Sequence, residues 1–299
     1  MLYTLILYIL LSTKDFIMPI QMFDNTKTPS IQNVIAIAAG KGGVGKSTMT
    51  VNLALALKRL GYEVGILDAD IYGPSIRKML PEDRLPTQRD ALITPALCQG
   101  IRMISIAYFR HENEAAVVRA PIANNVITQF IQNVSWGQLD YLLVDFPPGT
   151  GDIQLTLAQQ ANLTGAIVVT TPQEISLLDV RKAIHMFNQV KIPLIGIIEN
   201  MSYYVDPSSQ EKRFLFGEGG GKKLATEIGA PLLGSIPIDP EICRSGDEGS
   251  SLFSKTPLSS SAQSFQHAAG QLVDHVQVLK ENSKKGLSHF ELNWKEMAK

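Results

Sequence analysis

Apolar runs of strand length alternate with amphipathic stretches of helical period from residue 33 to about residue 240. The runs lie at residues 33–39, 62–68, 100–107, 141–145, 166–171, 194–199 and 232–237. Several of them are almost continuously apolar, which indicates strands that are buried on both faces. Strands that alternate with helices are typical of βαβ units around a parallel sheet. The pattern therefore predicts a doubly wound α/β fold with a mostly parallel sheet.

The segments outside this pattern divide the chain further. Residues 81–99 are rich in Pro, Asp and Thr and predict a surface excursion, and residues 203–221 predict a second long loop. Apolar residues at helical spacing predict a terminal helix that packs on the sheet, and these are Phe265, Ala269, Leu272, Val276 and Leu279. We expect a leader or flexible N-terminus over residues 1–30, a single domain over 31–282 and a charged tail over 283–299.

The first twelve residues, MLYTLILYILLS, are strongly apolar. They are too short to span a bilayer, and they lack the positively charged start of a secretory signal. We interpret residues 1–17 as an upstream start-site extension or a disordered leader, since Met18 begins a more polar stretch. A segment that touches a membrane is the alternative, and stable membrane insertion is not expected.

The composition is that of an ordinary globular protein. The chain has 299 residues, of which 45% are apolar, and a formal net charge of −1. This charge gives no basic field for nonspecific binding to nucleic acid, so we expect no nucleic-acid partner. The two cysteines, Cys98 and Cys243, lie far apart and form no disulfide framework, which fits a reducing cytosol. Each is first interpreted as a small core or surface residue.

The stretch GKGGVGKST has the spacing of a phosphate-binding loop. Glycines let backbone N–H groups approach phosphate oxygens, Lys46 supplies a charge to the outer phosphates, and Ser47 offers a hydroxyl to Mg²⁺. An apolar strand precedes the loop, and a helix follows it, so that the positive helix end faces the anion. The predicted nucleotide-binding residues here are Gly40, Lys41, Gly42, Gly43, Val44, Gly45, Lys46, Ser47 and Thr48. The alternative is a glycine-rich turn without a ligand.

A second motif, DFPPGTGD, begins at Asp145, where an apolar strand ends. The Asp145 carboxylate can hold a water of the Mg²⁺ shell, and the two prolines make a stiff turn. Gly149 can place its N–H on the terminal phosphate and move when that phosphate leaves, as in nucleotide switches. An ordinary turn between a strand and a helix is the alternative interpretation.

The third motif, AspAlaAsp at residues 68–70, closes another predicted strand. Two carboxylates near Mg²⁺ and a terminal phosphate can order the waters of the metal and position or deprotonate an attacking water. We assign this last role to Asp70 and place Asp68 nearer the metal shell. The alternative is a pair of solvated acidic loop residues.

Four motifs together, GKGGVGKST, DADIYGPS, DFPPGTGD and IENMS, resemble the Mrp/ApbC group of deviant-Walker ATPases, which are related to MinD and ParA. The resemblance covers about residues 30–255, and YGP and PPGTGD are specific to this branch of phosphate-loop proteins. It implies a P-loop NTPase domain of the deviant-Walker (SIMIBI) type. It further implies a cytosolic homodimer that binds ATP and carries an iron–sulfur cluster to client apoproteins.

The resemblance also implies roles for single residues. In deviant-Walker dimers the first lysine of the loop reaches the phosphates of the partner subunit, so Lys41 would neutralise charge that develops during hydrolysis there. A solvated loop lysine is the alternative. Asn200 matches the position whose amide meets the adenine edge. Pro237 and Asp239 follow the next strand and are placed at the base pocket.

The sequence departs from the family at residues 206 and 209. The family places a CxxC there, whose two cysteines from each subunit would supply four thiolates to one bridging cluster. Here the positions hold Asp206 and Ser209, which offer no soft ligand. Cys243 is then the candidate iron–sulfur ligand. Three explanations stay open: clusters handled through Cys243 or a partner's ligands, an ATPase with different clients, or a nucleotide-switched scaffold.

The sequence thus predicts a Mg²⁺-dependent ATPase that acts as a homodimer and transfers iron–sulfur clusters to apoproteins in the cytoplasm. Lys41, Lys46, Asp70 and Asp145 are its predicted catalytic residues, and Ser47, Asp68 and Asp145 its predicted Mg²⁺ site. Hydrolysis should be slow, because such switches are timed by opening and closure. The alternative is a positioning or scaffold protein similar to MinD and ParA, without a cluster. A small-molecule kinase or ligase is disfavoured, because no second substrate domain is evident.

Overall fold

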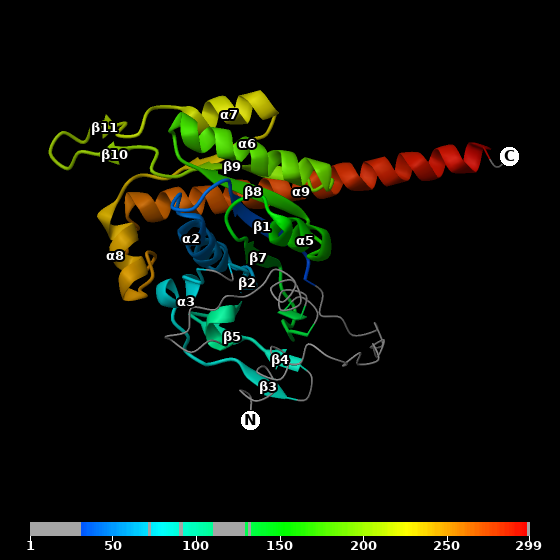
Figure 1. Ribbon diagram of the computed structural model, residues 1–299, viewed down its shortest axis with the longest axis horizontal. Coiled ribbons are helices and arrows are strands. Elements are labelled where there is room, and N and C mark those ends of the chain that lie inside the picture. Colours follow the sequence, from blue (N-terminus) through cyan, green and yellow to red (C-terminus); the bar gives the residue numbers. More distant parts are fainter. Residues whose placement is uncertain (1–30, 71–72, 90–91, 110–128, 131–132, 298–299) are drawn as a thin grey trace.

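The computed structural model describes residues 31–297 apart from 71–72, 90–91, 110–128 and 131–132 (Figure 1). The predicted leader over residues 1–30 lies outside the described residues. Helices lie on both sides of a central twisted sheet, and a long terminal helix projects from the body (Figure 1). The predicted doubly wound α/β fold is confirmed.

The central sheet has eight strands in the order β12-β9-β8-β1-β7-β2-β6-β5. Neighbouring strands are parallel except for the last pair, in which β5 is antiparallel to β6. Each strand predicted from an apolar run is present. The sheet also includes β5, which was not predicted. Its strands are β1 (Val34–Ala39), β2 (Val64–Asp68), β5 (Ala96–Cys98), β6 (Ile101–Ser105), β7 (Tyr141–Asp145), β8 (Gly165–Thr170), β9 (Leu194–Glu199) and β12 (Leu232–Ser235).

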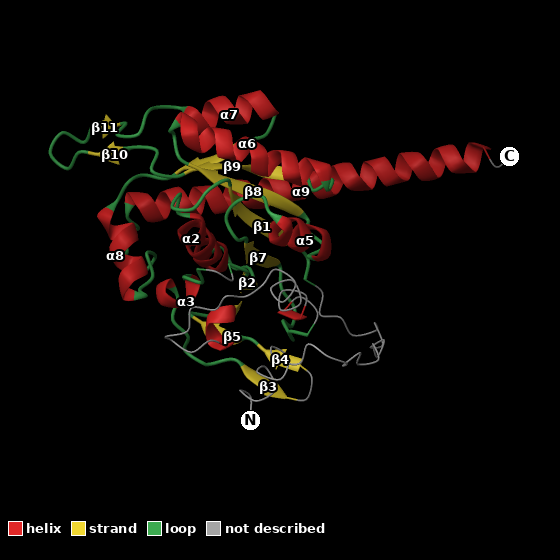
Figure 2. Ribbon diagram, viewed as in Figure 1, coloured by secondary structure: helices red, strands yellow, loops and turns green. Residues whose placement is uncertain are grey.

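The helices form a layer on each face of the sheet (Figure 2). One face is covered by α2 (Lys46–Arg59) and α9 (Ser260–Met297), the other by α5 (Asp152–Gln160), α6 (Glu174–Gln189) and α7 (Gly220–Ile228). The remaining elements are short. They are α3 (Ile76–Met79), a 3₁₀ helix (Ile106–Phe109), α8 (Pro240–Glu248) and the ribbons β3 (Thr87–Arg89) with β4 (Leu92–Thr94) and β10 (Tyr204–Val205) with β11 (Lys212–Arg213).

Alternate residues of β1 fill separate cores on the two faces of the sheet. In β1, Ile35 and Ile37 pack with α2 and α9, whereas Ala36 and Ala38 pack with α5 and the end of α6. All four are almost completely buried. Burial on both faces explains the continuous apolar runs of the sequence, and it fixes the strand ends that carry the polar motifs.

Three predicted segments are more structured than the sequence indicated. The excursion over residues 81–99 contributes β5, whose Ala96 and Cys98 are buried at the edge of the main sheet. The loop over 203–221 contains the ribbon β10–β11, which we call the arm together with its flanks, residues 202–219. The terminal helix continues from Ser260 to Met297, into the segment predicted as a charged tail. No helix in the described part of the chain combines the length and apolarity needed to cross a bilayer.

Candidate functional site

The polar motifs meet at the carboxyl ends of three neighbouring strands. β7 lies between β1 and β2 in the sheet, and Asp68 is paired in register with Asp145. The phosphate loop starts where β1 ends, one strand away from Asp145. Parallel doubly wound sheets bind ligands at this edge. The structure therefore brings together three motifs that lie far apart in the sequence, since Lys46 and Asp145 are 99 residues apart.

The phosphate loop needs glycine at two positions for different reasons. A Cβ on Gly40 would lie 2.2 Å from the backbone carbon of Asp179, so the loop passes directly over the α6 backbone at this residue. Gly45 has a φ of +86° and no room for a Cβ beside the amide of Asn200. Gly45 is also the N-cap of α2, and no side chain caps this helix end. The first N–H groups of α2 are thus left for an anion, as a phosphate site requires.

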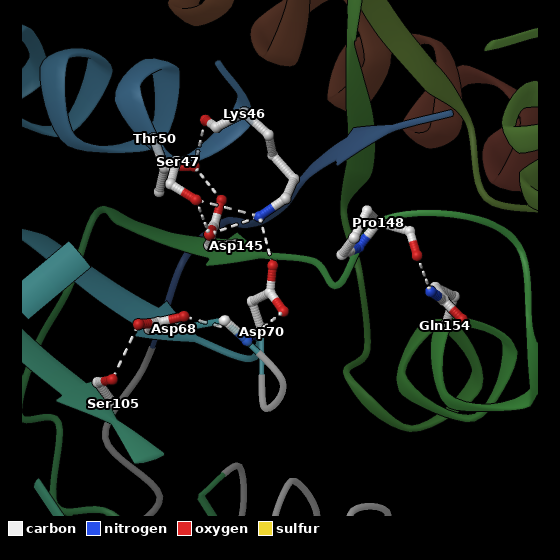
Figure 3. A network of polar contacts seen from close by, with 10 residues as sticks. Lys46, Ser47, Thr50, Asp68, Asp70, Ser105, Asp145, Pro148 and Gln154 are labelled. Atoms are coloured by element: carbon white, nitrogen blue, oxygen red, sulfur yellow. Dashed lines mark hydrogen bonds and ion pairs between the residues drawn. The ribbon is translucent and has the colours of Figure 1, made fainter. Parts of the chain in front are cut away.

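Lys46, Ser47, Asp70 and Asp145 form one network beneath this loop (Figure 3). The Lys46 ammonium lies 2.6 Å from Asp145 Oδ2 and 3.6 Å from Asp70 Oδ2. The Ser47 hydroxyl donates to the same Asp145 oxygen at 2.7 Å. Asp145 is fully buried, and Lys46 is 7% exposed. A buried carboxylate needs a charged or hydrogen-bonding partner. Lys46 and Ser47 are also the groups that would bind a nucleotide phosphate and its metal.

Asp68 is the second fully buried carboxylate of the site. Its Oδ2 accepts a hydrogen bond from the Ser105 hydroxyl at 2.8 Å, and its Oδ1 accepts from the backbone N–H of Asp70 at 3.3 Å. Burial raises the pKa of Asp68 to about 7, and the nearby Asp145 carboxylate acts in the same direction. Ser105 and Lys46 oppose this rise. Asp68 thus differs from Asp145, which has an ammonium group at 2.6 Å.

Two buried hydroxyl groups form hydrogen bonds with the Asp68 and Asp145 carboxylates. The sequence motifs did not predict either of them. Thr50 in α2 lies 2.6 Å from Asp145 Oδ1, and Ser105 at the end of β6 bonds to Asp68. Both hydroxyl residues are fully buried. In the sequence they are ordinary polar residues of an amphipathic helix and a strand. Only the pairing of distant strands and helices gives them partners, so no local signal identifies them.

The loop after Asp145 is held by its own backbone and by Gln154. Gly149 has a φ of +95°, and its N–H donates to the carbonyl of Ala39 at 3.3 Å. The Gln154 amide, at the start of α5, donates to the carbonyl of Pro148 at 2.5 Å. The N–H assigned to a terminal phosphate is therefore engaged by β1 in this state. A phosphate would have to take it from the Ala39 carbonyl.

Asn200 and Glu199 connect the phosphate loop to the arm. The Asn200 amide donates to the carbonyl of Val44 at 2.9 Å, so it lies against the phosphate loop. Glu199 is buried, and its carboxylate accepts hydrogen bonds from the Ser202 hydroxyl and the Gly221 N–H. Ser202 begins the arm and Gly221 follows its end. The two neighbouring side chains therefore contact the nucleotide loop and the base of the arm.

The other predicted binding residues have mixed surroundings. Asp239 caps α8 by accepting from the N–H of Glu241 at 2.8 Å, and its second oxygen accepts from the Ser261 hydroxyl. Pro237 is buried directly after β12. Both Asp239 oxygens are thus engaged in hydrogen bonds to the first turns of α8 and α9. Thr48 points its hydroxyl toward the sulfur of Met79 at 3.8 Å.

Lys41 differs from the other charged residues of the site. It is half-buried in the phosphate loop, and the described part of the chain gives it neither an ion pair nor a side-chain hydrogen bond. Gly42 and Gly43 beside it are exposed. Lys46, five residues later, has two acidic partners. Lys41 is therefore a loop cation whose charge its own described chain leaves uncompensated.

The donor atoms of the network suit Mg²⁺. Ser47 Oγ and Asp145 Oδ2 are hard oxygen ligands 2.7 Å apart. Asp68 ends the neighbouring strand β2, and Asp70 lies two residues beyond it. Mg²⁺ typically takes one or two carboxylates and fills its shell with waters and phosphate oxygens. No group of three or more His, Cys, Asp or Glu side chains among the described residues forms a dedicated metal cage. The Ser47 and Asp145 oxygens thus fit the preference of Mg²⁺ for a few protein oxygens.

The arm uses Asp206 and Ser209 to close a turn. Asp206 Oδ1 accepts from the N–H and hydroxyl of Ser208 and from the N–H of Ser209, and its Oδ2 lies 2.6 Å from Arg213. The Ser208 hydrogen bonds keep the pKa of Asp206 below its usual range. The Asp206 carboxylate is therefore already engaged within its own hairpin.

The two cysteines have different surroundings. Cys98 is buried in β5, and burial raises the pKa of its thiol to about 12. Cys243 is exposed on α8, with its sulfur 3.6 Å from an Asp247 carboxylate oxygen. The negative charge of Asp247 raises the pKa of the Cys243 thiol. A raised pKa favours the thiol over the thiolate that binds metals.

Comparison with known proteins identifies the family. The profile of a ParA-type family described as NUBPL iron-transfer P-loop NTPase matches residues 30–273. The chain belongs to this family. An iron–sulfur cluster carrier protein of Aquifex aeolicus is 44% identical over 259 residues, which are 86% of this chain and 71% of that protein. The protein of the same description from Escherichia coli K12 is 46% identical over 82% of this chain and 66% of its own length.

Solved structures agree with this family of iron-transfer P-loop NTPases. A nucleotide-binding protein of Archaeoglobus fulgidus, solved with ADP and containing cobalt, is 41% identical with a TM-score of 0.66. The match covers 73% of this chain and 87% of that one. The cell division ATPase MinD of Pyrococcus furiosus has a TM-score of 0.60 at 20% identity, over 81% of this chain and 98% of its own. MinD therefore shares the fold.

Proposed function

We propose that this protein is a Mg²⁺-dependent ATPase that works as a homodimer in the cytoplasm and serves the delivery of iron–sulfur clusters to apoproteins. One observation carries the ATPase assignment. Lys46, Ser47, Asp70 and Asp145 converge beneath an uncapped helix end, with the Lys46 ammonium between two carboxylates. The Archaeoglobus fulgidus relative with bound ADP supports an adenine nucleotide as the ligand.

In the proposed reaction each group has one task. Lys46 leaves Asp145 for the outer phosphates, and Ser47 with Asp145 would hold the Mg²⁺, which neutralises phosphate charge when bound. Asp70 accepts a proton from the attacking water, whose oxygen forms the new bond to the terminal phosphorus. The bond from that phosphorus to the bridging oxygen breaks, and ADP leaves. Gly149 donates its N–H to the transferred phosphate, and Asn200 recognises the adenine edge.

The proposed dimer rests on Lys41. A loop cation without an acidic partner in its own described chain is suited to neutralise phosphate charge on a second copy. Catalysis then requires two subunits, and hydrolysis separates them. Clients bind to one nucleotide state and leave in the other, so the slow step is opening of the dimer.

Clusters are the proposed cargo because the close relatives are iron–sulfur cluster carrier proteins. Cys243 is this chain's exposed thiol, and a dimer supplies two such thiols. The remaining ligands would come from the donor or the client. A positioning or scaffold protein without a cluster is the second candidate, and the Asp206 turn favours it, since this carboxylate is occupied by Ser208, Ser209 and Arg213.

Variants of Lys41 and Asp70 test the ATPase proposal. We expect Lys41→Ala to abolish ATP-dependent dimerisation and to lower turnover by a hundredfold or more, because the transition state loses a cation. Asp70→Asn should still bind ATP but lose about a hundredfold in turnover. Phosphate release and light scattering with ATP and with ADP measure both effects.

Lys182→Ala is the matched control for Lys41, since Lys182 is an exposed lysine paired with Asp179 on α6. It should behave like the wild type. Unchanged turnover and dimerisation in Lys41→Ala would remove the cross-subunit role, and unchanged turnover in Asp70→Asn would remove the assigned base.

A further inference from the structure

Asp145 has three hydrogen-bond donors, and one of them lies outside the proposed nucleotide chemistry. Lys46 and Ser47 donate to Oδ2 at 2.6 and 2.7 Å, whereas Thr50 donates to Oδ1 at 2.6 Å. Figure 3 shows Thr50, on the helix that follows the phosphate loop, beside Asp145. Nucleotide binding draws Lys46 to the phosphates and Ser47 to the metal. Thr50 has no such second task, so its bond to the carboxylate can persist when nucleotide binds.

We propose, resting on the ATPase function above, that Thr50 is a positioning residue for the magnesium site. Its hydroxyl fixes the rotation of the Asp145 carboxylate through Oδ1, so that Oδ2 keeps facing the phosphate loop when Lys46 and Ser47 have moved. Without this bond a carboxylate is free to rotate about its last torsion angle, which is broad. Binding of Mg²⁺ would then have to fix the orientation of the carboxylate, which would weaken the affinity for the ion.

The Thr50 hydroxyl has a choice of two acceptors. It lies 3.2 Å from the carbonyl oxygen of Lys46, one turn earlier in α2, and 2.6 Å from Asp145 Oδ1. A hydroxyl has one proton to donate. The shorter distance and the charge of the carboxylate direct it to Asp145, since charge-assisted hydrogen bonds are shorter and stronger. Thr50 and Asp145 are both fully buried, so water does not compete for this bond.

Rigid elements hold the two residues in contact. Met49 and Leu53 flank Thr50 on α2, and both are fully buried in the same core as Leu143 of β7. The helix therefore cannot shift over the strand without opening this core. Outer partners that orient a metal ligand typically change metal affinity or activity about 10- to 100-fold when they are lost.

Thr50→Val removes the hydroxyl with nearly the same shape, and Thr50→Ser keeps the hydroxyl. The measurement is binding of a fluorescent ADP analogue at increasing Mg²⁺ concentrations, including none, which involves no turnover. We expect Thr50→Val to match the wild type without Mg²⁺ but to need about 10- to 100-fold more Mg²⁺ for the tighter binding. Thr50→Ser should follow the wild-type curve. Thr50→Ala provides the same comparison if the valine variant does not fold.

The outcomes separate this inference from the function on which it rests. A Thr50→Val curve that coincides with the wild type overturns the positioning role and leaves the ATPase proposal intact. An equal loss of affinity with and without Mg²⁺ also overturns it, because the hydroxyl would then support the loop as a whole. Wild-type protein whose ADP binding does not respond to Mg²⁺ contradicts the proposed function itself.

Discussion

At the scale of single residues, the buried Asp68 carboxyl should make the stability of the protein depend on pH. Its pKa is raised to about 7 by burial and by Asp145, whereas in the unfolded chain an aspartate titrates near pH 4. Between these values the native state holds a proton that the unfolded state has lost. The free energy of unfolding of the nucleotide-free protein should therefore fall as pH rises from 4 to 7, by about 1 kcal/mol per pH unit.

Asp68→Asn tests this effect, because an amide neither titrates nor changes the shape of the side chain. Urea denaturation at pH 5, 6 and 7 should show a shallower loss of stability in Asp68→Asn than in the wild type. Equal slopes in the two proteins would show that Asp68 is ionised in the native state across this range.

The same residues show what the sequence can reveal about a site. Asp68 and Asp145 could be predicted, because each directly follows an apolar strand and parallel strands end at one edge. Thr50 and Ser105 could not, because their partners lie 95 and 37 residues away. Sheet order and helix packing determine which hydroxyls contact the two carboxylates, and a short sequence motif contains no information about either.

At the scale of elements, the loop between β7 and α5 should need the conformational freedom of Gly149 for ATP turnover. Gly149→Ala places a side chain at a φ of +95°, where the nearest atom is Gln154 Nε2 at 3.7 Å. The cost is thus conformational, about 1–2 kcal/mol of stability. We expect slower ATP turnover with unchanged ADP affinity, because the loop can no longer move its N–H freely from Ala39 to a phosphate. Stopped-flow phosphate release and urea denaturation measure the two effects.

Gly61→Ala is the matched control for Gly149→Ala. Gly61 has a φ of +97°, has open space around it and joins α2 to β2 outside the site. It should lose similar stability and keep its turnover. Equal turnover in the two variants would contradict the switching role of Gly149.

The elements also show where sequence patterns stop being informative. All strands of the central sheet except β5 were predicted, because their apolar runs are long. β5 has only three residues, Ala96–Cys98, too few to establish a period. The terminal helix continues to Met297. Leu287, Phe290, Trp294 and Met297 recur at helical spacing in its last part, so the pattern also extends into the segment that was predicted as a charged tail.

At the scale of the whole molecule, one chain cannot complete the proposed chemistry. Lys41 has no acidic partner in its own described chain, and the arm presents a closed turn where the family places two cysteines. Glu199 and Asn200 connect the two regions, since their side chains contact the base of the arm and the phosphate loop. In the proposed dimer a second subunit would therefore contact both regions. It would supply phosphate charge to Lys41, and it would meet the arm.

The arm yields the last prediction, a gain of function. Asp206→Cys with Ser209→Cys replaces the Asx turn by two thiols at the spacing of a CxxC, and a dimer then offers four thiolates, the number that one cluster needs. After anaerobic reconstitution with iron and sulfide, the double variant should show visible absorbance that corresponds to one cluster per two chains. A cluster retained by monomers would contradict the proposed arrangement of the arms in a dimer.

The wild type and Cys243→Ser, reconstituted in parallel, decide what the natural chain does. The exposed Cys243 thiol has a pKa raised by Asp247, and a dimer has only two such thiols, so we expect the wild type to hold less iron than the double variant. Absorbance that the wild type shows and Cys243→Ser loses would support cluster carriage through Cys243. If both lack a chromophore while ATP still binds, the nucleotide switch acts in this protein without a cluster of its own, as the scaffold alternative requires.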